Sequence, residues 1–249
     1  MIGLGTLLNM AAIVVGAAIG VLVGHRLPER TRDLITQALG LVTLVVAALN
    51  VVELLDPEWI SDVGSAAPLL IVLGSVVVGG IIGSLLRLED RVEHLGGWVQ
   101  RKVTRRNRAS SESRARFIEG FVDASLLFCI GPLAVLGALS DGLGKGIDQL
   151  ALKSVLDLFA SVAFAASLGW GVAFSAVSVG IVQGLFTVLG ALVGSVVAAS
   201  AIAALTATGG VLLIGVSLRL LKVSRIAVAD LLPALVIAPL LTMAVAAWM

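Results

Sequence analysis

Acidic side chains interrupt one long apolar stretch of this sequence at a spacing that could hold an ion or a proton. Glu119 and Asp123 lie four residues apart, so a helix places them on one face. An acid in lipid costs about 2.5–3.5 kcal/mol at the centre of a span, unless a partner, a proton or water compensates. Asp123, with Glu119 beside it, is therefore a candidate ion or proton site. The alternative is a structural acid that is hydrogen-bonded near the start of a helix.

A second pair of charges, Lys153 and Asp157, has the same four-residue spacing in the next apolar run. The base precedes the acid, which is the less favourable order for an ion pair along a helix. We predict that the two residues form either an ion pair at the membrane interface or part of a binding site. Contact between Lys153 and Asp123 is not expected, because an antiparallel pair of helices places them near opposite ends.

Two amides and one helix break complete the set of candidate site residues. Asn9 in the first apolar run is predicted either to make an interhelical hydrogen bond or to contact a solute. Gln183 lies near the middle of a long apolar run and is a second candidate for solute contact. Gly131-Pro132 removes a helical hydrogen bond, which a membrane tolerates where the backbone is buried or faces a cavity.

The apolar runs that carry these residues identify the class of fold. Of the 249 residues, 59% are hydrophobic and 13% are charged, whereas soluble domains carry about 25% charged residues. Lipid must therefore surround most of the chain, and runs of about 20 apolar residues mark the spanning helices. Eight runs qualify or nearly do: 2–24, 34–55, 69–86, 117–139, 151–168, 172–199, 201–218 and 229–248. We predict an all-α polytopic membrane protein of about eight spans, with a re-entrant segment at 169–182 as an alternative.

The basic residues divide unevenly between the two sides that eight spans define. Lys and Arg number 17, and all except Lys145 and Lys153 fall in three loops that share one side: 25–33, 87–116 and 219–228. The positive-inside rule makes this side cytoplasmic and places both termini outside. Trp59, Trp170 and Trp248, near the ends of apolar runs, are predicted to lie at the membrane interface.

The spans also suggest an internal repeat. An alignment of the second span with the seventh pairs Thr36 with Thr206 and Gly40 with Gly210. The first three spans would then match the last three at an odd offset, which inverts the second copy, as in many secondary transporters. We predict a single membrane domain of four successive parts: a three-helix unit (1–86), a basic amphipathic cytoplasmic loop (87–116), a central hairpin (117–168) and a second three-helix unit (169–249).

Small residues recur at every fourth position of the first span, at Ala12, Gly16, Gly20 and Gly24. Small residues at this interval let two helix backbones approach closely in lipid. We predict that they pack against another helix, and a glycine-lined pore is the alternative. Glycine faces of this kind are also compatible with a homo-oligomer.

Several function classes find little support in the sequence. Cys129 is the only cysteine, so an internal disulfide and a cysteine-based metal cluster are excluded. His25 and His94 both fall in loops, and none of the common hydrolase or metalloprotease motifs occurs at a plausible site. The net charge of +1 does not favour nucleic acid. We expect no enzyme activity, no metal centre and no cofactor.

Several stretches together resemble a known bacterial family. They are GFVDASLLFCIGPLAVLGALSDGL, LALKSVLDLFAS and VQGLF, with GTLLNMAAIVVGAAIG at the start and ATGGVLLIGVSLRLL near the end. These stretches resemble the membrane family of domain of unknown function 554, which includes YqgA- and YdfK-like proteins. The resemblance covers nearly the whole chain. It implies a multi-pass protein of the bacterial plasma (inner) membrane, and it implies no particular substrate.

We therefore predict a membrane transporter or channel for a small solute or ion, with a proton or cation as the candidate coupling species. Asp123 would bind the coupling ion, and Asn9 and Gln183 would contact the solute. The alternative is a scaffold or regulatory protein that does not transport and acts through the basic loop 87–116. The lipid bilayer is the expected partner in both cases.

Overall fold

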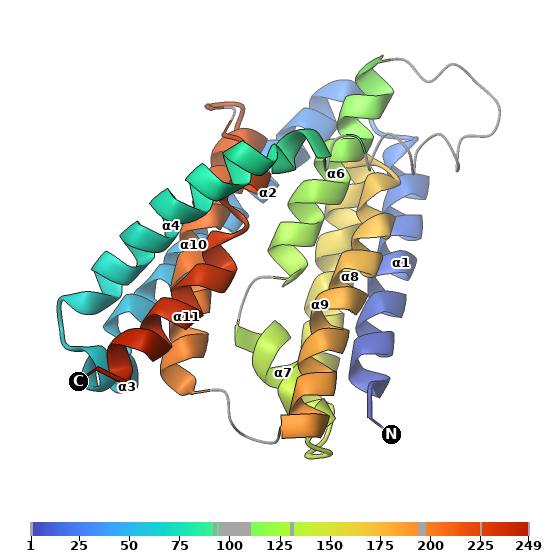
Figure 1. The fold of residues 1–249 in the computed structure, drawn as a ribbon. Helices are drawn as coiled ribbons and strands as arrows, with labels where there is room; N and C mark the ends of the chain where they lie inside the picture. The colour runs from blue at the N-terminus through green and yellow to red at the C-terminus, as the bar shows by residue number, and fades with distance from the viewer. Residues whose placement is uncertain are drawn as a thin grey trace. The chain divides into compact units, whose positions relative to one another are not determined.

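The computed structural model describes residues 2–91, 94, 111–129, 132–193, 198–224 and 226–248. Within these ranges every regular element is a helix, which confirms the predicted all-α fold (Figure 1). The long helices are α1 (Leu4–Gly24), α2 (Glu29–Val51), α4 (Ala67–Leu86), α6 (Ser111–Cys129), α7 (Pro132–Gly142), α8 (Asp148–Leu168), α9 (Gly171–Val193), α10 (Ala199–Leu220) and α11 (Ala234–Ala246). The short ones are η1 (Val52–Leu55), α3 (Pro57–Val63) and η2 (Val228–Leu231).

The number of spans agrees with the sequence prediction. In the part of the chain that the structure describes, 7 helices are long and apolar enough to cross a membrane. The bent pair of α6 and α7 makes up to 8 if it forms one span, and its two helices are inclined by 64°. The re-entrant segment considered for 169–182 is wrong, because α9 continues without interruption from Gly171 and the chain turns just before it, at Gly169.

Large apolar side chains cover the outer faces of several spans. On α4 the exposed side chains are Leu69, Leu70, Leu73, Val77, Val78 and Ile81. Monomeric soluble proteins rarely expose a continuous apolar face of this extent, whereas lipid is the solvent in which such a face is stable. These surfaces indicate that the helices span a membrane.

The helices form two compact units, and neither is a continuous stretch of sequence. Unit 1 contains α1, the first part of α2 and α6 to α9, apart from the first residue of α7. Unit 2 contains the remainder of α2, η1, α3, α4, α10, η2 and α11. The boundary in α2 falls between Leu39 and Gly40. The two units therefore interleave in sequence, and the division into four successive parts stays a prediction.

In unit 1, α1 runs along α8 and touches it through the row of glycines (Figure 1). A Cβ atom on Gly20 would collide with the carbonyl oxygen of Val162 in α8, and similar collisions occur one turn away at Gly16 and Gly24. Glycine at these positions lets the two backbones come into contact. The predicted packing role is confirmed, and the glycine-lined pore is wrong. Because the row is used within the chain, the homo-oligomer stays a prediction.

The broken pair α6 and α7 packs along α9. The Ser125 hydroxyl on α6 donates to the Ser178 hydroxyl in the first half of α9, at 3.0 Å. On α7, Leu139 meets Gly190 in the second half of α9, where a Cβ would lie 2.6 Å from the Leu139 carbonyl oxygen. The break between α6 and α7 is therefore level with the middle of α9.

Unit 2 is built around α10, the most buried of the candidate spans. Of its apolar window, 78% is buried, against 28% for α4 and for α11. The contacts between α2 and α10 are reciprocal. A Cβ on Gly40 would lie 2.8 Å from Leu221, and a Cβ on Gly210 would lie 2.9 Å from Val51. Each glycine thus faces a branched side chain at the far end of the other helix.

The loop after η1 folds into the short helix α3 and closes one end of unit 2. Asp56 caps α3 by accepting the backbone N–H of Trp59 at 2.7 Å, and Pro57 occupies the first helical position. These are standard start signals of a helix. Trp59 is 0% exposed and packs in a cluster with Val63, Ile71 and residues of α10 and α11. The ring of Trp59 is therefore buried in unit 2 by α3, and its location at the membrane interface stays a prediction.

The basic loop after α4 begins with a sharp break. Arg87 has a left-handed φ of 50°, and α4 ends at Leu86. The helix therefore does not continue straight into the loop. Glu89 then accepts from Arg219 at 3.0 Å and from the backbone N–H of Ala229 at 2.8 Å, all within unit 2. Most of the predicted amphipathic loop, residues 92–93 and 95–110, lies outside the described residues. The loop is also shorter than expected, because α6 begins at Ser111.

The contact between α1 and α8 can be tested with a matched pair of glycine variants. Gly20→Ala should lower the stability of the protein in detergent by roughly 1–3 kcal/mol, because the new methyl group overpacks a backbone contact. Gly74→Ala on α4 should leave stability unchanged, since nothing lies within 4 Å of that position. Thermal unfolding followed by size-exclusion chromatography measures both. Equal effects of the two substitutions would contradict the packing described here.

Candidate functional site

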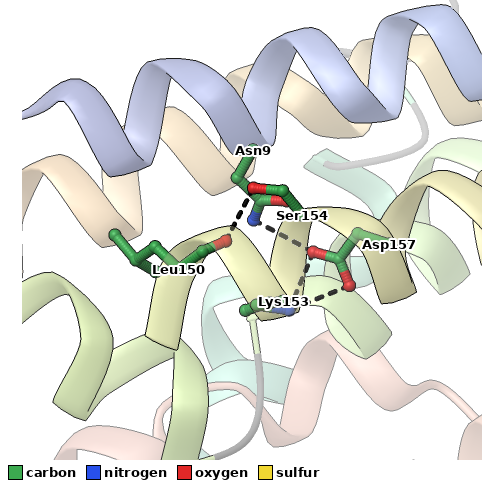
Figure 2. Close-up of polar contacts among 5 residues, drawn as sticks. All are labelled: Asn9, Leu150, Lys153, Ser154 and Asp157. Atoms are coloured by element: carbon green, nitrogen blue, oxygen red, sulfur yellow. Dashed lines mark hydrogen bonds and ion pairs between the residues drawn. The ribbon is translucent and has the colours of Figure 1, made fainter. Parts of the chain in front are cut away.

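A buried polar cluster lies in unit 1 where α1 meets α8 (Figure 2). Lys153 Nζ donates to both carboxylate oxygens of Asp157, one turn further along α8, at 3.0 and 2.8 Å. Asn9 on α1 donates from Nδ2 to Asp157 Oδ2 at 3.0 Å. Ser154 beside them donates to the backbone oxygen of Leu150 at 2.6 Å. The Asn9 amide on α1 is thus connected to an ion pair that lies within α8.

The ion pair is buried inside unit 1 and is not solvated. Lys153 is 7% exposed, Asp157 is 6% exposed and Asn9 is 0% exposed. Asp157 is the tenth of the 21 residues of α8, so it lies about 14 Å from the start of the helix and near its midpoint. The interfacial ion pair considered from the sequence is therefore wrong. The close contact of α1 with α8 covers both charges.

A buried ion pair of this kind contributes little to the free energy of folding. Removing each charge from water costs several kcal/mol, and the attraction between the charges compensates only in part. Apolar residues of similar volume often stabilise a protein equally well or better. Ionisable residues at depth in a membrane protein commonly mark pathways for ions, protons or substrates. The Lys153–Asp157 pair is therefore the strongest functional candidate in the described chain.

Gln183 on α9 brings a second amide to the same level. It is 0% exposed, and neither its Nε2 nor its Oε1 has a hydrogen-bond partner among the described residues. About one turn to either side on the same face, Gly180 lies against Met10 and the Thr187 hydroxyl lies 3.4 Å from that of Thr6. These two contacts place Gln183 level with the segment of α1 that carries Asn9.

Asn9 has an unused acceptor as well. Its Oδ1 is buried and has no hydrogen-bond partner in the ranges that the structure covers. Buried polar atoms in proteins almost always have a partner, either protein or ordered water. The free amide atoms of Asn9 and Gln183 are therefore suited to water, to a cation held by amide oxygens, or to a small polar solute.

Asp123 and Glu119 lie on α6, away from this cluster. Asp123 is 0% exposed, Glu119 is half-buried, and each already takes part in an interaction. Gly120 of α6 faces Leu168 of the antiparallel helix α8. By this register Asp123 lies roughly 18 Å from Lys153 along the helix axis, at 1.5 Å per residue. Direct contact between the two is absent, as expected, and ion binding by Asp123 and Glu119 stays a prediction.

The predicted helix break coincides with the end of α6 at Cys129 and the start of α7 at Pro132. Gly131 itself lies outside the described residues. Because α6 covers the first half of α9 and α7 covers the second, the break is level with Gln183. The helix break and Gln183, both candidates from the sequence, therefore lie at the same level of unit 1.

Asp141 is a buried acid whose role the sequence analysis missed. It lies on α7, is 3% exposed, and accepts the backbone N–H groups of Gly3 and Gly5 at 3.0 Å each. Helix α1 begins without a side-chain cap of its own. The first N–H groups of any helix need acceptors, so the missing cap signals a remote one, although it does not say which residue. Asp141 therefore holds the start of α1.

These observations define a class of protein: a multi-pass α-helical membrane protein with a buried polar cluster in one of its units. The family described as "Protein of unknown function (DUF554)" matches residues 4–243. The chain therefore belongs to this family, as the resemblance noted above implied. No solved structure matches the chain significantly.

Two curated relatives span almost the whole chain. The chain is 30% identical over 245 residues to "Uncharacterized protein YqgA" of Escherichia coli (strain K12), a match that covers 98% of each. It is 27% identical over 235 residues to "Uncharacterized membrane protein YdfK" of Bacillus subtilis (strain 168), covering 94% of this chain and 93% of that protein. The name of the second relative supports a membrane protein, and neither name gives an activity.

The ion pair can be tested by a double-mutant cycle. Asp157→Leu and Lys153→Met should each destabilise the protein by about 3–5 kcal/mol, because each leaves one charge buried without its partner. The double variant Lys153→Met/Asp157→Leu should recover most of that loss. Denaturant unfolding in detergent micelles gives the four free energies. If the single losses simply add in the double variant, the two side chains do not interact as described.

Proposed function

We propose that this protein is a transporter for a small solute or ion, coupled to a proton or a monovalent cation through Asp157 and Lys153. The observation that carries the proposal is the buried ion pair at mid-span, with partnerless amide atoms of Asn9 and Gln183 at its level. Asp157 takes the coupling ion in this scheme, and the two amides contact the transported species. Asp123 and Glu119 remain candidates for a second ion position on α6.

The chemistry of coupling follows from the charges. Asp157 now accepts from Lys153 and Asn9, so the cluster has no net charge. A proton or cation that binds the carboxylate competes with the Lys153 ammonium and leaves it without a counter-charge. In a low-dielectric interior the loss of the counter-charge changes the electrostatic free energy far more than it would in water. An ion that binds one arrangement of α1 and α8 better than another shifts the population between them.

The contacts between α2 and α10 support the predicted inverted repeat. The alignment pairs Gly40 with Gly210, and by the same offset it pairs Val51 with Leu221. A two-fold relation requires that each contact occur twice with the roles exchanged. The contact of Gly40 with Leu221 and that of Gly210 with Val51 meet this requirement. Inverted repeats with interrupted helices are common in secondary transporters.

The membrane and the orientation are part of the proposal. The relatives come from bacteria, and the basic residues gather on one side of the predicted topology. We place the protein in the plasma (inner) membrane with both termini outside. The alternative of a scaffold that acts through loop 87–116 gains no support, because residues 92–93 and 95–110 of that loop lie outside the described chain.

Flux through reconstituted liposomes tests the assignment of Asp157. Wild-type protein should dissipate an imposed pH, Na⁺ or K⁺ gradient, alone or with a panel of amino acids and small organic acids, faster than empty liposomes. Asp157→Asn should reduce that flux to background, because it removes the proposed ion-binding carboxylate. Internal pH and ion-sensitive dyes report the flux.

Two control variants separate transport from folding. Asp148→Asn removes an exposed acid in the first turn of the same helix and should keep full flux. Lys153→Met/Asp157→Leu should remain folded and be inactive. The proposal is wrong if the wild type moves none of these ions or solutes, or if Asp157→Asn transports normally while folded.

The orientation has its own test. In a Cys129→Ser background, a cysteine at the exposed Lys145 should react with a membrane-impermeant maleimide on intact cells. A cysteine at Arg30 should react only after the membrane is opened, because its loop is predicted to be cytoplasmic. The reverse labelling pattern would overturn the proposed topology.

A further inference from the structure

A second polar feature of unit 1 is a surface pocket at the other end of α1 from Asp141. It has a volume of about 270 Å³ and is lined by residues of α1, α2, α6 and α8 and of the turn between α8 and α9. Its lining residues all belong to unit 1. Drug-sized ligands usually occupy about 300–1,000 Å³, so this pocket suits a smaller group. It belongs to the side of the protein that the basic residues predict to be cytoplasmic.

The polar lining is basic. His25, Arg32 and Arg116 line the pocket, and no acidic residue is among the lining residues. Arg32 is held in place because its Nε and Nη2 donate to the Gly24 carbonyl oxygen at 3.0 and 2.6 Å. The Ser167 hydroxyl donates to the Arg32 carbonyl at 2.7 Å and fixes its backbone. A guanidinium has five N–H donors, so this clamp leaves donors on Nη1 for an anion.

The rest of the lining is apolar. Val21, Phe117, Leu168 and Trp170 contribute to its walls, and Trp170 is 49% exposed. Tryptophan is enriched where lipid headgroups meet the hydrocarbon region. A pocket with bases for a phosphate and an apolar wall beside them fits an amphiphile better than it fits a free ion. Basic pockets between spanning helices on the cytoplasmic side are known places for anionic headgroups.

We propose that the pocket formed by His25, Arg32 and Arg116 binds the phosphoryl headgroup of an anionic phospholipid of the cytoplasmic leaflet. The phosphate accepts hydrogen bonds from the guanidinium groups, and the acyl region lies against the apolar wall and the Trp170 ring. Guanidinium–phosphate bonds are charge-assisted and therefore strong. The bound lipid connects the ends of α1, α2, α6 and α8, so it stabilises unit 1 independently of any transport activity.

Thermal unfolding of the full-length protein in nanodiscs or mixed micelles tests this site. Phosphatidylglycerol should raise the apparent melting temperature by about 5 °C or more relative to phosphatidylcholine, because a ligand that binds only the folded state stabilises it. The variant His25→Gln/Arg116→Gln should lose most of that rise. Arg32→Lys, which keeps the charge and loses the planar fork, should lose part of it.

Control variants distinguish lipid binding in the pocket from a general effect of positive surface charge. Arg26→Gln and Arg30→Gln remove exposed bases from the same loop without touching the pocket lining, and should keep the full rise. If they lose as much as the pocket variant, the proposal is wrong. Inorganic phosphate and glycerol 1-phosphate, added without lipid, should give no rise. If a soluble phosphate raises the melting temperature as much as phosphatidylglycerol does, and the pocket variant abolishes that rise, the ligand of the pocket is a soluble phosphate and not a lipid.

Discussion

The close contact between α1 and α8 is the constraint on which the rest of unit 1 depends. Glycines at positions 16, 20 and 24 bring the two backbones together, and the contact excludes both lipid and water from the space between the helices. Any polar side chain in that space must find its partner inside the protein. Asp157 finds Lys153 and Asn9 there. The ion pair and the glycine row are thus two consequences of one helix–helix contact.

The buried polar groups of unit 1 divide into two kinds by whether their atoms have partners. Asp141 accepts two backbone N–H groups, and Ser125 bonds to Ser178, so these groups satisfy one another and tie helices together. Asn9 and Gln183 keep amide atoms that no described residue satisfies. The Gln183 amide makes no hydrogen bond to a described residue, so packing alone does not explain it, whereas a binding site needs atoms left over for its ligand. The Ser161 hydroxyl of α8 is buried without a hydrogen-bond partner among the described residues as well, so Asn9 and Gln183 remain candidate site residues.

The sequence was sufficient for the spans, because about 20 apolar residues in a row have few other uses. It also selected Asn9, Lys153, Asp157 and Gln183, since polar residues within apolar runs are conspicuous. The sequence could not predict that residues of α1, α8 and α9 lie close together, because helices that are neighbours in unit 1 come from distant parts of the chain. Asp141 was missed for the same reason: its partners, the first turn of α1, are more than a hundred residues away. The burial of Trp59 was not foreseen because a short capped helix, rather than a loop, follows the second span.

The two halves of α1 make different contacts, and only the first half contacts Asp157. This difference decides which part of α1 responds when the charge of Asp157 changes. The half from Gly16 to Gly24 packs against the backbone of α8, and the Gly24 carbonyl also accepts from Arg32; neither contact involves Asp157. The half from Gly3 to Asn9 is held by polar contacts to Asp141, Asp157 and a hydroxyl of α9. Two of those three contacts end on carboxylates, so a proton or cation that neutralises Asp157 weakens the first half of α1 and leaves the second half intact. A change of charge at mid-span therefore acts on the end of α1 that is predicted to face outside, with the glycine row as its fixed point.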